Sequence, residues 1–139
     1  MNIEEKKHEA LKEFLKVPEN ERYKYLIQKG RKLKEMDKNF KIDKYKIKGC
    51  QSEVWVYPEF KQGKIYFKFD GEAAVIKGIL FILEKIYSGS TPDEILNLNE
   101  DFLKESGLIA NLSMTRSNGI AQVLRQIKMY ALVFKSLNK

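Results

Sequence analysis

The chain has 139 residues, of which 43% are hydrophobic and 32% are charged, and it contains one cysteine and one histidine. This length fits a domain that buries its core without disulfides or metals, and the composition excludes disordered and collagen-like chains. The 26 Lys and Arg exceed the 19 Asp and Glu, and the resulting net charge of +7 favours acidic partners. We predict one domain over residues 1–139.

The first residues mix acids with lysine and do not resemble a secretion signal. No apolar run approaches the roughly 20 residues that a membrane-spanning helix needs. A single unpaired cysteine agrees with a reducing compartment. We therefore expect a cytoplasmic protein without a membrane partner.

Two amphipathic helices are predicted first. Residues 3–16 carry apolar side chains at helical spacing, namely Leu11, Phe14 and Leu15. Pro18 suits the first turn of a second helix that ends near Gly30 or Leu33. The side chains that we expect this second helix to bury are Tyr23, Leu26 and Ile27. Residues 34–46 show no periodic pattern, and an irregular connection of this length is typical of a functional segment.

Three short strands are predicted next, at residues 45–48, 53–57 and 65–69. The last two are rich in β-branched and aromatic residues, which favour strands. Residues 58–64 would form the turn between them, and residues 49–52 the turn before them. We therefore expect Cys50 at the tip of a tight loop in a three-stranded antiparallel sheet.

The rest of the sequence predicts helices. Residues 73–87 form a broadly apolar helix that Gly89 ends, and Thr91 with Glu94 forms a capping box around Pro92. A last helix begins at Thr115 or Ser117. Its predicted inward face consists of Ile120, Val123, Leu124, Ile127, Ala131 and Phe134. The predicted class is α+β, with a small three-stranded antiparallel sheet packed against several helices.

Several common types of catalytic or binding site are disfavoured, because the residues that they require are missing or unfavourably placed. His8, the sole histidine, lies among charged residues on the first helix and is predicted to be solvated, which argues against a metal site and a Cys–His hydrolase. No phosphate-binding glycine motif and no CxxC motif is present. The acids alternate with lysines as on solvated helix faces. The aromatic residues fall at core spacing, although the basic balance keeps a nucleic-acid-binding domain open as an alternative.

The lone thiol is the remaining candidate. A cysteine is most often buried and inert, but Gly49, Gln51 and Ser52 are turn residues that would expose Cys50. Upstream lysines at positions 44, 46 and 48 would favour the thiolate, which is the nucleophilic form. Without a second cysteine or a histidine base, an internal disulfide cycle and acyl-enzyme catalysis are both disfavoured. A lone thiolate on a loop could still accept a sulfur atom from another protein.

Residues 49–55, GCQSEVW, resemble the GCQSxVW signature of the SufE family, sulfur acceptors in iron–sulfur cluster biogenesis. Further similar segments occur in the family's order, at residues 73–78, 89–92 and 112–119 and in the basic last helix. Together they cover about residues 8–135. The region after the second helix departs from the family, since residues 33–37 lack proline and Tyr45 replaces a frequent asparagine.

The resemblance implies that Cys50 accepts persulfide sulfur from a pyridoxal-phosphate cysteine desulfurase of SufS or CsdA type. It further implies that the protein stimulates the desulfurase and relays sulfur to the SufBCD scaffold. The desulfurase holds the cofactor, so this chain would need no cofactor or metal and would turn over no small molecule. The implied fold is like that of IscU, with a cysteine loop that can turn its sulfur inward or outward.

Supporting roles follow from the same resemblance. Arg116 would steady the loop or a sulfur anion, or else pair with a nearby acid at the helix start. Glu72 would contact the desulfurase or favour the following helix N-terminus. Gly49, Gln51 and Ser52 would shape the loop. The alternative function is a thiol-independent adaptor or basic nucleic-acid-binding domain in which Cys50 only fills a turn.

Overall fold

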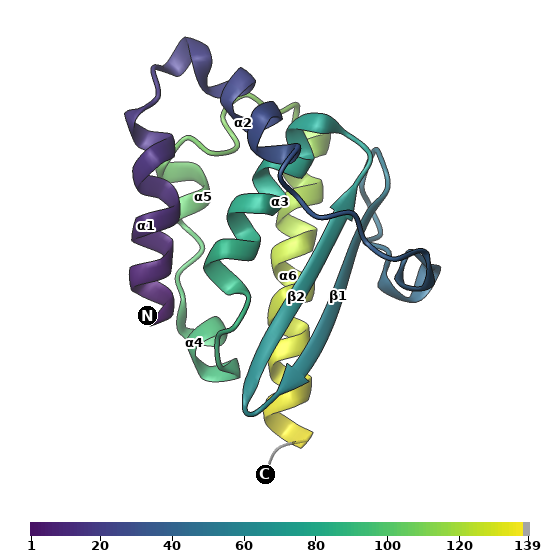
Figure 1. The fold of residues 1–139 in the computed structure, drawn as a ribbon. Coiled ribbons are helices and arrows are strands. Elements are labelled where there is room, and N and C mark those ends of the chain that lie inside the picture. Colours follow the sequence, from purple (N-terminus) through teal and green to yellow (C-terminus); the bar gives the residue numbers. More distant parts are fainter. Residues whose placement is uncertain (138–139) are drawn as a thin grey trace.

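The computed structural model describes residues 1–137 and has an α+β fold (Figure 1). A two-stranded sheet lies on one side, α3 packs behind it, and α1 and α2 pack on α3. The helices are α1 (Ile3–Lys16), α2 (Arg22–Gly30), α3 (Ala74–Tyr87), α4 (Pro92–Asn97), α5 (Phe102–Glu105) and α6 (Met114–Leu137). Within these described residues, no helix is long and apolar enough to cross a bilayer.

The sheet consists of β1 (Val54–Lys61) and β2 (Lys64–Gly71), which pair antiparallel along their whole length. Gln62 and Gly63 form the turn, and both have positive φ angles, of 50° and 78°. Two-residue turns of this kind match the right-handed twist of the flanking strands, so pairing extends to the turn itself. The predicted turn at residues 58–64 was therefore too long.

The predicted third strand was wrong. Tyr45 ends a 3-10 turn at Asp43–Tyr45, and Lys46 forms only an isolated bridge with Trp55. One further backbone contact joins the segments, where the Ile47 N–H donates to the Val54 carbonyl oxygen over 2.8 Å. The chain turns away at the Gly49 loop before a ladder develops. A sheet of two strands is only marginally stable alone, so this one depends on the helices behind it.

The core forms between the inner face of the sheet and the helices. Ile65, Phe67 and Phe69 of β2 are buried against α3. α3 and α2 lie very close, because a Cβ atom at Gly78 would overlap the backbone of Leu26. The predicted inward position of Tyr23 was wrong, since this side chain is 44% exposed.

The predicted signals at the helix ends were largely confirmed. Gly89 has a φ of 80° just beyond α3, and the Thr91–Glu94 capping box opens α4. α6 begins slightly earlier than predicted, at Met114, where the Ser113 hydroxyl accepts a hydrogen bond from the Arg116 N–H. The predicted inward residues from Ile120 to Ala131 are buried, and the sixth, Phe134, is half-buried.

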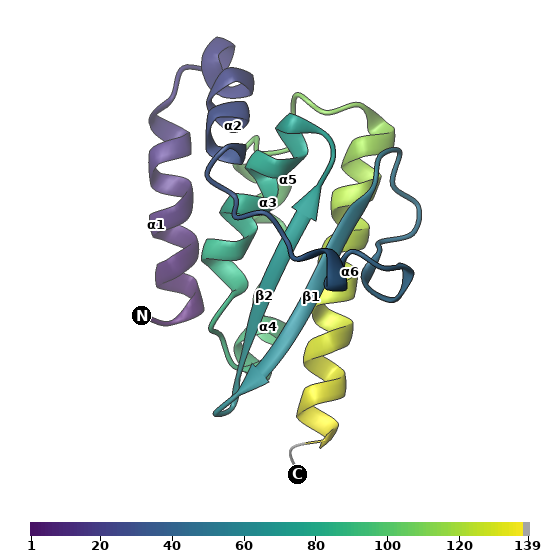
Figure 2. The ribbon, with the colours of Figure 1, turned by 45° about the vertical axis from the view of Figure 1, so that its right-hand side comes forward.

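The connection between α2 and β1 crosses the outer face of the sheet (Figure 2). Asp70 of β2, only 2% exposed, holds it there. The Asp70 carboxylate accepts a hydrogen bond from the Met36 N–H over 3.1 Å and pairs with the Lys41 ammonium at 3.0 Å. Phe40 also stacks on Tyr57, with ring centroids 3.9 Å apart. This connection is therefore a fixed part of the molecular surface.

Candidate functional site

The thiol of Cys50 contacts the first part of α6. Gly49, with a φ of 85°, turns the chain, and the Cys50 Sγ atom then lies 3.8 Å from the Gly119 carbonyl oxygen. A Cβ atom at position 119 would stand 3.1 Å from this sulfur. Only glycine at this position leaves the sulfur its full space, so Gly119 determines how deeply the thiol sits.

The sulfur lies in a small cavity of about 10 Å³ beneath the loop. That volume is about what one water molecule requires. Its lining residues are Cys50, Gln51, Ser52, Val54, Ile76, Arg116, Gly119 and Ile120. Cys50 as a whole is half-buried. The residue does occupy a loop as predicted, but its sulfur points inward against α6, and the prediction of an outward-facing thiol was wrong.

Burial raises the pKa of the Cys50 thiol above its ordinary value. The predicted lowering by the lysines at positions 44, 46 and 48 was therefore wrong. These three exposed side chains border a separate surface hollow together with Asp43, and none lines the thiol cavity. Burying the thiolate costs more free energy than its interaction with the solvent-screened lysine charges recovers. The resting thiol is therefore protonated.

Arg116 is the one ionisable neighbour of the thiol in this cavity. Its side chain is half-buried, and its Nε atom is fully buried with no hydrogen-bond partner among residues 1–137. A buried donor without a partner costs stability in most proteins. Arg116 therefore lines the thiol cavity and carries an N–H donor that the described residues do not use.

Glu72 holds the end of the loop. Its carboxylate accepts a hydrogen bond from the Glu53 N–H over 2.8 Å, and its own N–H donates to the Glu53 carbonyl oxygen. The sequence suggested for Glu72 a contact with the desulfurase or a role at the following helix N-terminus, and it missed this contact because the two residues are 19 positions apart. Gln51 and Ser52 line the cavity, with Gln51 exposed and Ser52 half-buried.

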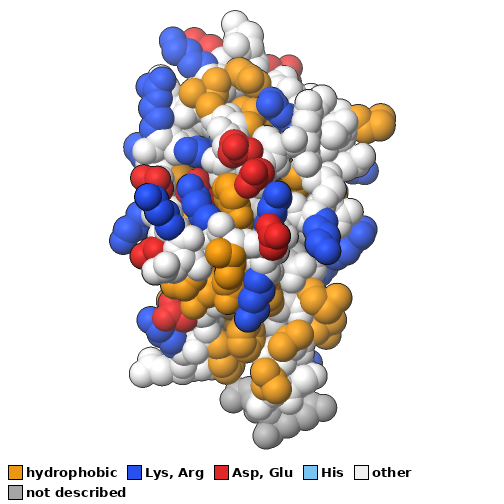
Figure 3. All heavy atoms as spheres, turned by 90° about the vertical axis from the view of Figure 1, so that its right-hand side faces the viewer, with side chains coloured by type: hydrophobic (Ala, Val, Ile, Leu, Met, Phe, Trp, Pro, Cys, Tyr) orange, Lys and Arg blue, Asp and Glu red, His pale blue; other side chains and the backbone are white. Residues whose placement is uncertain are grey.

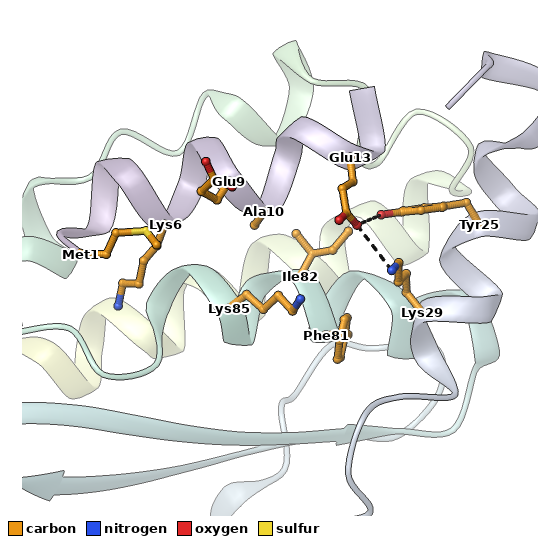
Figure 4. Close-up of a pocket in the computed structure, with 10 residues that line it drawn as sticks. All are labelled: Met1, Lys6, Glu9, Ala10, Glu13, Tyr25, Lys29, Phe81, Ile82 and Lys85. Atoms are coloured by element: carbon orange, nitrogen blue, oxygen red, sulfur yellow. Dashed lines mark hydrogen bonds and ion pairs between the residues drawn. The ribbon is translucent and has the colours of Figure 1, made fainter. Parts of the chain in front are cut away.

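A larger cavity of about 370 Å³ lies between α1, α2 and α3 (Figure 4). Its principal polar groups pair with one another, since Glu13 contacts both the Tyr25 hydroxyl, at 3.4 Å, and the Lys29 ammonium, at 3.6 Å. It shares no lining residue with the thiol cavity. Within residues 1–137, no group of His, Cys, Asp and Glu is arranged to hold a metal ion. The Cys50 cavity is therefore the candidate site.

Residues 8–131 match the family model described as SufE, Fe-S metabolism associated domain. The chain belongs to the SufE family. It is 32% identical over 114 residues to the uncharacterized SufE-like protein slr1419 of Synechocystis sp., an alignment that covers 82% of this chain and 72% of that protein.

The same fold occurs in the solution structure of a hypothetical protein from Thermus thermophilus. The two structures superpose with a TM-score of 0.77 over 96% of this chain and 97% of the other, at 20% sequence identity. This likeness establishes the fold. Membership of the SufE family associates the protein with iron–sulfur metabolism.

Proposed function

We propose that the protein accepts sulfur on Cys50 from the persulfide of a cysteine desulfurase and carries it toward iron–sulfur cluster assembly. The observation that carries this proposal is the position of the Cys50 sulfur. It lies on a surface loop, in a cavity about the size of one water molecule that Arg116 also lines, and the buried Arg116 Nε has no hydrogen-bond partner among residues 1–137. Membership of the SufE family supports the assignment to iron–sulfur metabolism.

The transfer is an exchange between sulfur atoms. The Cys50 thiol loses its proton, and the thiolate attacks the outer sulfur of the donor persulfide. A bond forms between Cys50 Sγ and that outer sulfur, while the bond from the outer sulfur to the donor cysteine breaks. The donor cysteine departs as a thiolate. Cys50 then carries the persulfide, and no external oxidant or reductant is required.

The inward position of the sulfur sets the order of events. A raised pKa keeps the resting thiol protonated and therefore weakly nucleophilic. Attack requires the loop to turn outward, where contact with water removes the cost of burying a thiolate. After transfer, the loaded cysteine is protected if the loop turns back, because a persulfide left in solvent is open to oxidation.

The Arg116 Nε offers the loaded cysteine a hydrogen bond. A terminal persulfide sulfur readily carries negative charge, and a guanidinium N–H donates strongly to an anion. In this role Arg116 positions and stabilises the carried sulfur and performs no reaction itself. Its alternative predicted role, pairing with an acid at the helix start, leaves the Nε donor unexplained.

In this proposal the protein is a carrier and not an enzyme with its own small-molecule substrate. It stimulates a SufS- or CsdA-type desulfurase by removing its persulfide and passes the sulfur to a SufBCD scaffold. The pyridoxal phosphate belongs to the desulfurase. Each of these roles extends the chemistry proposed for Cys50 to a partner protein.

To test the proposal, the protein is incubated with free cysteine and either a SufS-type or a CsdA-type desulfurase. The mass of the intact chain is then measured by mass spectrometry. We expect a gain of about 32 Da, one sulfur atom, which reductant removes and which Cys50→Ser abolishes. A native protein that gains no sulfur from either desulfurase would favour the thiol-independent adaptor or nucleic-acid-binding alternative.

A further inference from the structure

The connection that runs from α2 across the sheet to the Cys50 loop (Figure 2) is strongly basic. Residues 31–48 contain eight Lys and Arg against three Asp and Glu, a net charge of +5 within a chain of +7. One of these cations, Lys41, pairs with the buried Asp70. The other seven are exposed, and we call them the basic collar: Arg31, Lys32, Lys34, Lys38, Lys44, Lys46 and Lys48.

The collar has a defined shape because its backbone is held to the sheet. Met36 is 4% exposed and Ile47 is 5% exposed, so the two ends of the connection are anchored by burial. Between them, Tyr45 packs edge-on against Tyr57 at 4.9 Å, and Lys41 lies over the Trp55 ring at 5.2 Å. The exposed charges are therefore presented on a rigid support rather than on a free loop.

None of the collar side chains lines the thiol cavity. Burial, and not the lysines, controls the pKa of the Cys50 thiol. Among the described residues, the collar's only ion pair is a loose one, with the Lys46 Nζ 4.0 Å from the Glu53 carboxylate. In Figure 3, which shows the side of the molecule that lies on the right in Figure 1, Lys and Arg side chains are interspersed with Asp, Glu and apolar side chains. The charge is available to an external partner.

We propose that the basic collar docks the acidic surface of the sulfur donor and so brings its persulfide to the Cys50 loop. This inference rests on the proposed function. Lys48 lies two residues before Cys50, and Lys44, Lys46 and Lys48 border one hollow. A protein that reaches the thiol therefore passes this edge of the surface. Complementary charge would accelerate its association and orient it.

The aromatic residues near the collar favour a protein partner over a nucleic acid. The nearest aromatic rings, Phe40, Tyr45 and Tyr57, pack on one another and leave no open platform on which a base could stack. Carboxylates on a folded protein can pair with a rim of lysines without such a platform.

The test compares two triple variants of equal charge. K44E/K46E/K48E reverses the collar beside the thiol, and K12E/K16E/K24E reverses three exposed lysines of α1 and α2. Association with whichever desulfurase loads Cys50 is measured by stopped flow at increasing salt. We expect the collar variant to associate about tenfold more slowly at low salt, and the control to keep most of the native rate. The native and collar-variant rates should converge near about 1 M salt, where screening is nearly complete.

Equal slowing of both triple variants would show that only net charge matters and would overturn the proposal, as would an unchanged collar variant. Circular dichroism checks folding, and K44Q/K46Q/K48Q replaces the collar variant if reversal unfolds the chain. A double-stranded DNA oligonucleotide is titrated in parallel. Weaker DNA binding with unchanged desulfurase association would assign the collar to nucleic acid.

If the native protein gains no sulfur from either desulfurase, the proposed function itself fails. If it gains sulfur and the collar variant associates like the native protein, only the docking surface fails.

Discussion

The Cys50 Sγ atom lies 3.8 Å from the carbonyl oxygen of Gly119, a residue 69 positions further along the chain. This contact places a loop thiol against a helix backbone at the one residue type that leaves it room. The depth of the sulfur follows from this contact, and burial in turn raises the pKa of the thiol.

Gly119→Ala should displace the Cys50 sulfur outward. The new Cβ atom would stand 3.1 Å from Sγ, which is closer than carbon and sulfur normally approach, so the loop must shift. We expect iodoacetamide to alkylate Cys50 several-fold faster, while helix stability is maintained because alanine favours helices over glycine. Asn118→Ala, at the exposed neighbouring position, is the control. Unchanged alkylation of Gly119→Ala would mean that position 119 does not set the depth of the sulfur.

The alkylation rate of Cys50 should depend on pH as expected for a thiol with a raised pKa. In the folded protein, the midpoint of the rate profile should lie above that of the same chain unfolded in urea, because burial disfavours the thiolate. The corresponding contribution to stability is full below the unfolded pKa and is lost as pH rises through the folded pKa. A folded midpoint at or below the unfolded one would contradict the buried position.

Arg116→Gln should impair retention of sulfur on Cys50 more than it impairs folding. The variant removes the buried Nε donor, and a hydrogen bond to a charged group contributes about 1.5–3 kcal/mol. We therefore expect the persulfide on Cys50 to be lost about ten times faster or more, as followed by intact mass over time. Arg125→Gln is the matched control, since Arg125 is exposed on the same helix. Equal persulfide lifetimes in the two variants would show that Arg116 does not stabilise the persulfide on Cys50.

Asp70→Asn should loosen the connection that carries the basic collar. Burial alone would raise the pKa of Asp70, but the Met36 N–H, the Lys41 ammonium and the Gly71 N–H together hold it below its ordinary value. The Lys41 side chain is 28% exposed, so losing the charge-assisted hydrogen bonds of Asp70 should cost about 1.5–3 kcal/mol, which urea unfolding at pH 7 would measure. Asp43→Asn, at an exposed position of the same connection, is the control.

The same carboxylate predicts a pH dependence. Because the folded pKa of Asp70 is lowered, its contribution to stability is present above the unfolded pKa and is lost as pH falls through the folded pKa. The difference in unfolding free energy between native protein and Asp70→Asn should therefore shrink below about pH 4. A difference that stays constant into strong acid would show that the ion pair is not responsible.

Much of the fold could be predicted because its signals are local. The apolar spacing of residues 3–16, the stop at Gly89 and the Thr91–Glu94 capping box each act within a few residues and were confirmed. The third strand failed for the opposite reason. Residues 45–48 resembled a strand in composition, but pairing depends on the path of the chain, which leaves β1 after one bridge.

For the site, the sequence by itself determined the candidate thiol, its turn and the SufE signature, because these are properties of adjacent residues. Only the tertiary structure decided that the sulfur packs against Gly119 and that Arg116 is the cation lining its cavity. The lysines nearest in sequence extend into water, where their charges are screened, while Arg116 reaches the cavity from another element. Burial, which no short segment encodes, outweighs nearby charge in setting the state of the thiol.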